Sequence, residues 1–162
     1  MSNIANVLAD AIIDTMKASS DFNTLFFIQG VALNVPVQYY PNAEVHIASS
    51  RTVRAHTGNW YEKVYTGEVR FYDRYQDRLE FVDRVAVIAS TSAVSAWVRL
   101  FTRLFEQTAN KDLQDLDDTD FKVTNVLMGD ISYGWEQRDQ RSNNWDNYGA
   151  VRFEVYTIEV NT

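Results

Sequence analysis

The first apolar residues of the chain recur at the spacing of an α-helix. Positions 4, 7, 8, 11, 12 and 16 form one stripe, whereas Asn6, Asp10 and Asp14 fall outside it. A stripe of this width predicts an amphipathic helix that packs on a core. Ser2 or Asn3 is a suitable N-cap for this helix, and the polar residues 19–21 end the pattern.

A second helical stripe lies near the middle of the chain, and Thr91 or Ser92 is a suitable N-cap for it. Its three aromatic side chains indicate a helix that lies across a sheet and covers the core. The residues before it, 79–89, fit either a strand or a helix. Their β-branched side chains and the polar break at residues 90–92 favour a strand followed by a new helix. The stripe consists of Val94, Trp97, Val98, Phe101, Leu104 and Phe105.

Between these helices the pattern changes to that of strands and turns. Prolines and a glycine interrupt residues 22–41, which predicts a short apolar strand or turn. Val45 and Ile47 then alternate with their neighbours, and a similar alternation over residues 65–71 follows the turn signal at 57–59. These alternations predict a β-hairpin.

Two more strands are predicted in the last third of the chain. The first runs over residues 121–133, with Gly129 as a candidate bulge. In the second, over residues 151–160, the apolar parity reverses after Tyr156. Because one extra residue exchanges the two faces of a strand, this reversal predicts a bulge near Tyr156–Thr157.

The order helix, strands, helix, strands predicts an α+β fold. We expect an antiparallel or mixed β-sheet, with the N-terminal helix and the second long helix packed on one face, and long β-hairpin arms. No repeat or linker divides the sequence, so we interpret residues 1–162 as one domain, within the usual size of roughly 100–200 residues.

Charge and composition limit the classes of function that the chain can have. The net charge of −7 disfavours proteins that hold DNA or an anionic membrane by neutralising phosphates, but it allows DNA to pass an acidic wall. The chain has no cysteine, which removes disulfides, zinc–thiolate sites and cysteine nucleophiles. Asp10 and Asp14 interrupt the first apolar stretch, so we expect no secretory signal, and no apolar run reaches the ~18 residues of a membrane span.

The sequence contains no recognisable catalytic or cofactor motif. His46 and His56 lack the helical spacing of a zinc site, and no Gly-x-Ser-x-Gly or phosphate-binding glycine motif is present. A histidine in a strand is more often a polar surface residue than a general base. We therefore expect neither an enzyme nor a bound cofactor or metal.

One cluster of carboxylates precedes the strand at 121–133. A calcium loop is one interpretation, but Asp120 occupies its glycine position and Val126 its twelfth position, which needs glutamate. A solvated acidic connector is the commoner alternative, and the acidic rim or lumen of a channel is a third. The cluster comprises Asp112, Asp115, Asp117, Asp118 and Asp120.

The best candidates for a protein interface are two aromatic hairpin segments, residues 55–63 and residues 136–149. Residues 136–149, between two predicted strands, are longer than an ordinary hairpin loop and mix both charge signs with aromatic rings. Trp and Tyr combine rigid area with a hydrogen-bonding tip, as buried contacts with a partner require. Trp145 folded back on its own sheet is the alternative. The candidate interface residues are Trp60, Tyr61, Arg138, Arg141, Trp145 and Tyr148.

The layout resembles the tail-terminator, or tail-completion, proteins of tailed bacteriophages, and loosely the head–tail neck proteins. The likeness lies in the N-terminal amphipathic helix, the entry Tyr40-Pro41-Asn42-Ala43-Glu44-Val45, the long aromatic helix and the final hairpin from Leu127 to Val155.

The resemblance implies a structural virion protein that is assembled in the host cytoplasm. Such proteins form a homo-oligomeric ring, typically a hexamer, that ends the tail tube and joins it to the head connector while DNA passes through without sequence-specific binding. A neck or head-completion connector is one alternative. Another is a cone-shaped α+β domain that binds a small molecule, with Trp97, Phe101 and Tyr133 lining its pocket.

Overall fold

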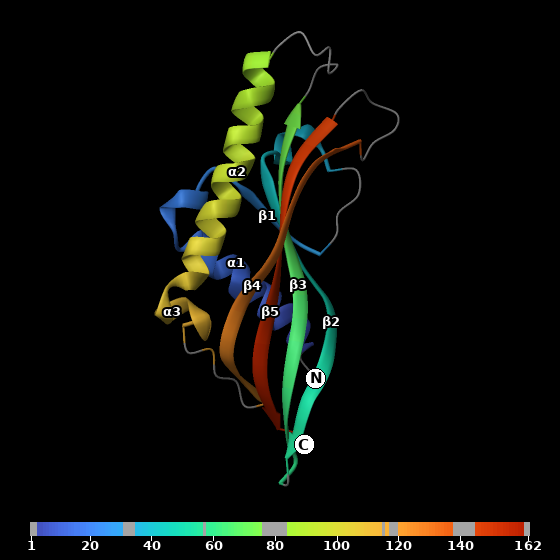
Figure 1. Cartoon of the computed structure of the whole chain (residues 1–162), viewed down its shortest axis with the longest axis vertical. Coiled ribbons are helices and arrows are strands. Elements are labelled where there is room, and N and C mark those ends of the chain that lie inside the picture. The colour runs from blue at the N-terminus through green and yellow to red at the C-terminus, as the bar shows by residue number, and fades with distance from the viewer. Residues whose placement is uncertain are drawn as a thin grey trace.

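In the computed structural model, helices lie on one side of a mixed β-sheet and the molecule is elongated along its strands (Figure 1). The structure describes residues 3–30, 35–56, 58–75, 84–114, 116, 120–137 and 145–160. Its helices are α1 (Ile4–Lys17), α2 (Arg84–Glu106) and α3 (Thr108–Lys111), with short 3-10 turns at Ser20–Phe22 and Val37–Tyr39. Its strands are β1 (Phe26–Gln29), β2 (Asn42–His56), β3 (Trp60–Tyr75), β4 (Phe121–Glu136) and β5 (Trp145–Val160).

The described residues form a five-stranded sheet in the order β1-β2-β3-β5-β4. β1 is parallel to β2, and every other neighbouring pair is antiparallel. The predicted α+β class, with a mixed sheet, an N-terminal helix and a second long helix, is confirmed. The turn between β2 and β3 uses positive φ angles at Gly58 (102°) and Asn59 (63°), which these two residue types tolerate best.

The N-terminal stripe forms α1 as predicted. The Asn3 side chain accepts a hydrogen bond of 3.0 Å from the amide of Ala5, so Asn3 is the N-cap. Leu8, Ile12 and Met16 are fully buried on the side of α1 that contacts the sheet. The helix is therefore held by its apolar stripe.

The predicted strand over residues 79–89 is wrong for its described part, because α2 already begins at Arg84. Thr91 and Ser92 lie inside this helix and do not cap it. The polar break has another cause. The side-chain amide of Asn147 on β5 donates to the hydroxyls of Ser90 (3.2 Å) and Thr91 (3.3 Å). These hydroxyls join α2 to the sheet.

The predicted reversal of faces in β5 is also wrong. β5 keeps one parity throughout, so Thr157 and Glu159 are buried although they are polar, whereas Ile158 lies on the other face. A register shift does occur opposite Tyr156 and Thr157, but it lies on β4, between Val123 and Asn125. A second shift between Met128 and Ile131 confirms the bulge expected at Gly129.

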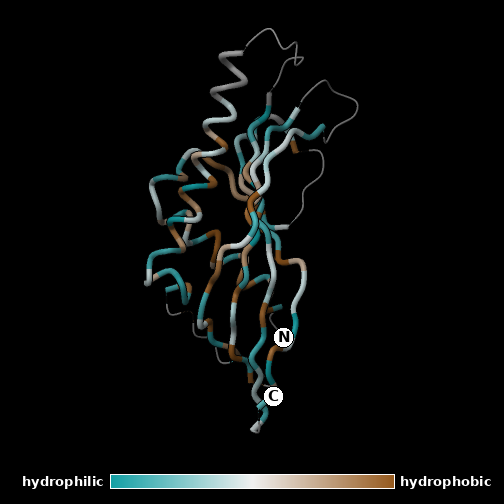
Figure 2. Tube along the Cα trace, in the orientation of Figure 1, coloured by the Kyte–Doolittle hydropathy of each residue, from teal (hydrophilic) through white to brown (hydrophobic). Residues whose placement is uncertain are grey.

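The core lies between the helices and the middle of the sheet, where Figure 2 shows hydrophobic positions gathered. The Phe101 ring on α2 is fully buried and contacts the rings of Phe71 on β3 and Phe153 on β5, at centroid distances of 5.8 and 6.3 Å. Gly149 allows α2 to approach β5, since a Cβ there would lie 2.6 Å from Val98 and 2.9 Å from Val94.

A substitution at Val151 tests which face of β5 points into the core. Its side chain is fully buried among core residues, so Val151→Asp places an unpaired carboxylate in the core. We expect a loss of stability on the order of 3–5 kcal/mol, measured by chemical unfolding. Arg152→Asn, at an exposed position on the outer face of the same strand, is the control and should change stability by less than about 1 kcal/mol. Equal stability of the two variants would contradict the assignment.

Candidate assembly surfaces

Both histidines of the chain lie within the described residues. No group of three or more His, Asp or Glu side chains among the described residues is arranged to hold a metal ion. His46 is exposed on β2, opposite Glu68 of β3. His56 stacks on Trp60, with ring centroids 3.6 Å apart, and its Nε2 lies 3.3 Å from a carboxylate oxygen of Glu62. The two histidines do not share a site.

Within the part of the chain that the structure describes, the most deeply buried ion pair joins Arg74 of β3 to Asp146 of β5. Their side chains are 5% and 0% exposed, and the guanidinium donates to both carboxylate oxygens, at 2.7 and 3.2 Å. Arg74 also donates to the Tyr40 hydroxyl (2.9 Å) and the Val35 carbonyl (2.8 Å), while Tyr40 donates to Asp146 (2.8 Å). This network ties the segment before β2 to the two central strands, so we interpret it as structural.

Next to this pair, Asp73 lies on the helix side of β3. Burial raises the pKa of Asp73, a hydrogen bond from Ser90 opposes the shift, and the negative charge of Asp146 adds to it. Asp73 and Asn147 pair directly across β3 and β5, and both bond Ser90 of α2. Together they hold the first turns of α2 against the sheet.

The predicted interface residues Trp60 and Tyr61 begin β3 at one end of the molecule. Because they are consecutive strand residues, their side chains lie on opposite faces of the sheet. Trp60 stacks on His56, and Tyr61 lines an open cleft of about 290 Å³ on the helix side. They therefore form two contact points and do not make a single patch.

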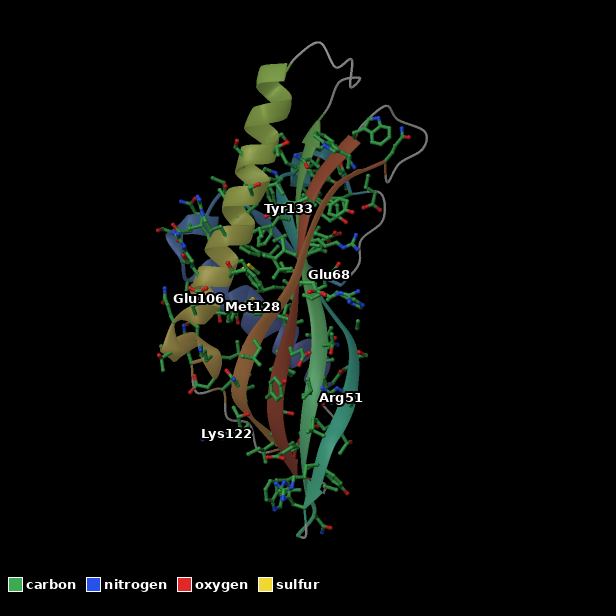
Figure 3. The ribbon with its side chains drawn as sticks, viewed as in Figure 1. Arg51, Glu68, Glu106, Lys122, Met128 and Tyr133 are labelled. Atoms are coloured by element: carbon green, nitrogen blue, oxygen red, sulfur yellow. The ribbon has the colours of Figure 1, made fainter. Side chains whose placement is uncertain are left out.

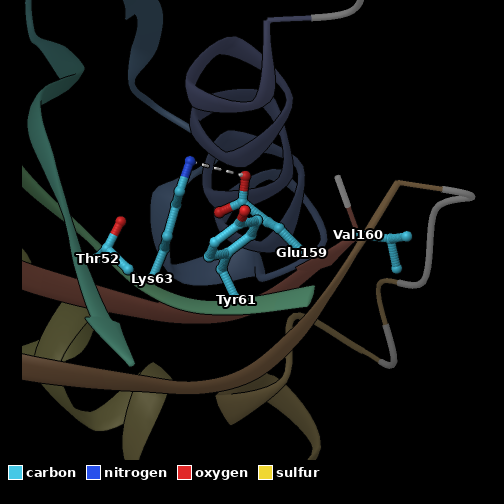
Figure 4. A pocket seen from close by; sticks show the side chains of 5 residues that line it. All are labelled: Thr52, Tyr61, Lys63, Glu159 and Val160. Atoms are coloured by element: carbon cyan, nitrogen blue, oxygen red, sulfur yellow. Dashed lines mark ion pairs between the residues drawn. The ribbon is translucent and has the colours of Figure 1, made fainter. Parts of the chain in front are cut away.

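That cleft contains a buried carboxylate, Glu159 (Figure 4). Glu159 accepts hydrogen bonds from the hydroxyls of Tyr65 (3.0 and 3.1 Å) and Thr157 (3.0 Å), and Lys63 lies 3.7 Å away. Burial, the charge of Glu159 and the hydrogen bond from the Tyr65 hydroxyl to Glu159 together raise the pKa of the Tyr65 phenol above its usual value. These neighbours satisfy the hydrogen-bonding capacity of the Glu159 carboxylate, so the side chain can be buried on the helix side of the sheet.

The other predicted pair, Trp145 and Tyr148, belongs to β5. The loop expected over residues 136–149 is therefore shorter, because Glu136 ends β4 and β5 starts at Trp145. Tyr148 packs against Tyr72, with ring centroids 5.9 Å apart, and the Arg70 guanidinium lies 5.3 Å from its ring. Trp145 is half-buried at the end of the strand. Pairing with β3 has drawn both aromatic residues into the sheet.

The two aromatic pairs lie at opposite ends of the molecule. β3 and β5 pair without a register shift from Trp60↔Val160 to Tyr75↔Trp145. At about 3.3 Å per residue, this places Trp60 and Trp145 roughly 50 Å apart. A single partner would have to span this distance to contact both pairs, so the molecule has two separate aromatic ends.

Of the predicted carboxylate cluster, the structure describes Asp112, which follows the last residue of α3, and Asp120. Asp120 precedes β4. Its carbonyl accepts from the amide of Val160 at 2.9 Å, so it lies at the Trp60 end. The other predicted interface and rim residues, Arg138, Arg141, Asp115, Asp117 and Asp118, lie outside the described residues.

The sheet face away from the helices carries charges of both signs. Glu68 on β3 pairs with Arg70 and lies 3.8 Å from Arg152 of β5, and Arg70 lies 3.8 Å from Glu136 of β4. Figure 3 shows Arg51 and Glu68 on this side, with Met128 on the helix side. Exposed ion pairs of this kind add little stability, so the face is a polar surface of mixed charge.

Sequence reasoning missed the exposed apolar residues of β4. Leu127 (43% exposed), Ile131 (47%) and Tyr133 (54%) are among the most exposed large hydrophobic side chains that the structure describes. Leu127 pairs with Glu154 and lies on the face away from the helices, whereas Ile131 and Tyr133 pair with Val151 and Gly149 and lie on the helix side, because the bulge between Met128 and Ile131 exchanges the faces. All three stay exposed because β4 is the edge strand of the sheet. Their clustering on one edge strand marks β4 as a surface for contact.

No protein-family model and no curated protein matches the chain. Within the described residues, no helix is long and apolar enough to cross a membrane. The surfaces themselves must therefore support any functional assignment. They comprise two aromatic ends and one exposed apolar edge strand.

The alternative of a small-molecule pocket receives little support from the residues proposed to line it. Phe101 is fully buried, and the centroid of its ring lies 5.0 Å from that of Phe105. The ring centroids of Trp97 and Phe71 are 6.5 Å apart. Tyr133, in contrast, is more than half exposed on β4. Phe101 and Trp97 are packed against other core aromatics, and Tyr133 lies on the surface.

The raised pKa of Asp73 predicts a pH-dependent stability. Because the folded state binds this proton more tightly than the unfolded chain, the charged carboxylate opposes folding once the pH exceeds its unfolded pKa of about 3.9. Asp73→Asn should therefore raise the melting temperature at pH 7, and the gain should disappear below about pH 4. Melting curves of the two proteins from pH 3 to pH 7 measure this gain. Asp10→Asn, at an exposed position of α1, is the control. A lower melting temperature for Asp73→Asn at pH 7 would contradict the prediction.

Proposed function

We propose that this protein caps the end of a bacteriophage tail tube as a ring of identical subunits. The ring, which we take to be a hexamer, stops tail polymerisation and joins the tail to the head connector while DNA passes through. The protein acts through contacts with itself, the tube protein and the connector, and has no enzymatic role. Its place is the virion, after assembly in the host cytoplasm.

The observation that carries this proposal is the separation of Trp60 and Trp145 along the strands. A ring between a tube and a connector needs two different surfaces on its two sides. If the ring axis runs along the strands, the Trp60 end lies on one side of the ring and the Trp145 end on the other. Trp and Tyr are enriched among residues that dominate binding energy, so each end is suited to one partner.

Charge agrees with passage of DNA without retention. The chain carries 22 acidic and 15 basic residues. A wall with this balance releases few counterions on contact with DNA and therefore has little affinity for it. Asp120 at the Trp60 end is a candidate member of an acidic rim, together with Asp115, Asp117 and Asp118.

Electron microscopy of the purified protein with tail tubes tests the function. The expected result is a ring at one end of each tube and tubes that no longer grow when tube protein is added. Rings that bind head connectors but leave tube growth unchanged would assign the protein to the neck. Particles that neither form rings nor bind tubes would overturn the proposal.

The aromatic ends give a sharper prediction. Trp60→Ala and Trp145→Ala should each keep the ring and most of the melting temperature, since both side chains are only half-buried. One variant should lose tube capping and the other connector binding, each by at least about tenfold, the loss expected for an aromatic residue at the centre of an interface. Binding assays with tubes and connectors measure this, and Arg99→Ala on exposed α2 is the control. Loss of both activities in the same variant would show that the ends are not separate surfaces.

A further inference from the structure

The sheet has two unpaired edges within the described residues. β4 is the last strand on one side, and only β5 pairs with it. On the other side, β1 pairs with β2 only from Asn42 to Val45, so β2 has no outer neighbour over residues 46–56. Long unpaired edges expose backbone donors and acceptors that readily pair with another strand.

These edges are compatible in strand direction. β2, β3, β5 and β4 alternate in direction, because each neighbouring pair is antiparallel. β4 is therefore antiparallel to β2 of its own chain. A rotation about an axis along the strands preserves these directions, so β4 of one copy meets β2 of the next copy as an antiparallel partner.

Charge and apolar surface also match across the two edges. Residues 46–56 contain two arginines and two histidines and no carboxylate, whereas residues 120–136 contain three carboxylates and one lysine. Val53 on the β2 edge is 50% exposed, and Leu127 on the β4 edge is 43% exposed. Opposite charge and exposed apolar groups favour contact between these edges over contact of either edge with its own copy.

We propose that β4 of one copy pairs, antiparallel, with residues 46–56 of β2 in the next copy, so that the sheet continues from subunit to subunit. The contact is heterologous and can therefore repeat around a closed ring. Strand addition at a sheet edge supplies main-chain hydrogen bonds, and the edge side chains supply the specificity. This inference rests on the proposed ring and names the interface that builds it.

One row of residues identifies positions for a test. Ser49 on β2 pairs with Thr66, Thr66 pairs with Glu154, and Glu154 pairs with Leu127 on β4. Ser49 and Leu127 therefore lie at the two edges of the same row, and both are exposed. In a continuous sheet, Leu127 of one copy lies near Ser49 of the next.

The chain has no cysteine, so an introduced thiol is the only one present. Full-length Ser49→Cys and Leu127→Cys, one of them tagged, are mixed and treated with a short bismaleimide, which tolerates a register offset of about two residues, roughly 7 Å. We expect the mixed, singly tagged dimer as the main product, and a ladder up to the full ring for the double variant. Ser49→Cys mixed with Arg99→Cys on exposed α2 is the control and should stay uncrosslinked.

The outcomes separate this interface from the proposed function. A ring-sized mass without the mixed dimer would overturn the strand pairing and leave the ring intact. Dimers of Leu127→Cys alone would show that two β4 strands pair about a two-fold axis, which also overturns it. A monomeric mass without any cross-link would overturn both the interface and the ring.

Discussion

The uninterrupted pairing of β3 with β5 fixes the rest of the structure. Both strands are 16 residues long and stay in one register from end to end. Side chains therefore keep one parity over the whole length, so the core residues Val151, Phe153 and Val155 continue into the polar residues Thr157 and Glu159 on the same face. The flanking strands β2 and β4 accommodate the twist of this pair through their register shifts.

The same pairing explains which elements could be predicted from the sequence. α1 depends on a local apolar period and a local cap, Asn3, and both are visible in the sequence. The start of α2 was missed because Ser90 and Thr91 bond Asn147, which lies far away in the sequence. The parity of β5 was missed because the apolar Ile158 lies on the outer face, whereas the buried Glu159 is satisfied by Tyr65 and Thr157.

For the candidate surfaces, the sequence predicted residue types better than positions. Trp60, Tyr61, Trp145 and Tyr148 could be singled out as aromatic residues near polar segments. Their separation into two ends follows only from the β3–β5 register, which requires the tertiary structure. The exposure of Leu127, Ile131 and Tyr133 depends on the place of β4 at the edge of the sheet and on the bulge in β4, neither of which is a local property.

We propose that an elongated subunit, with a different surface at each end and two compatible edges, closes into a ring. The mass of the intact protein in solution, from native mass spectrometry at increasing concentration, tests it most directly. We expect one dominant species at six times the subunit mass of 18.7 kDa. A chain that remains monomeric at all concentrations, or stops at a dimer, would contradict it.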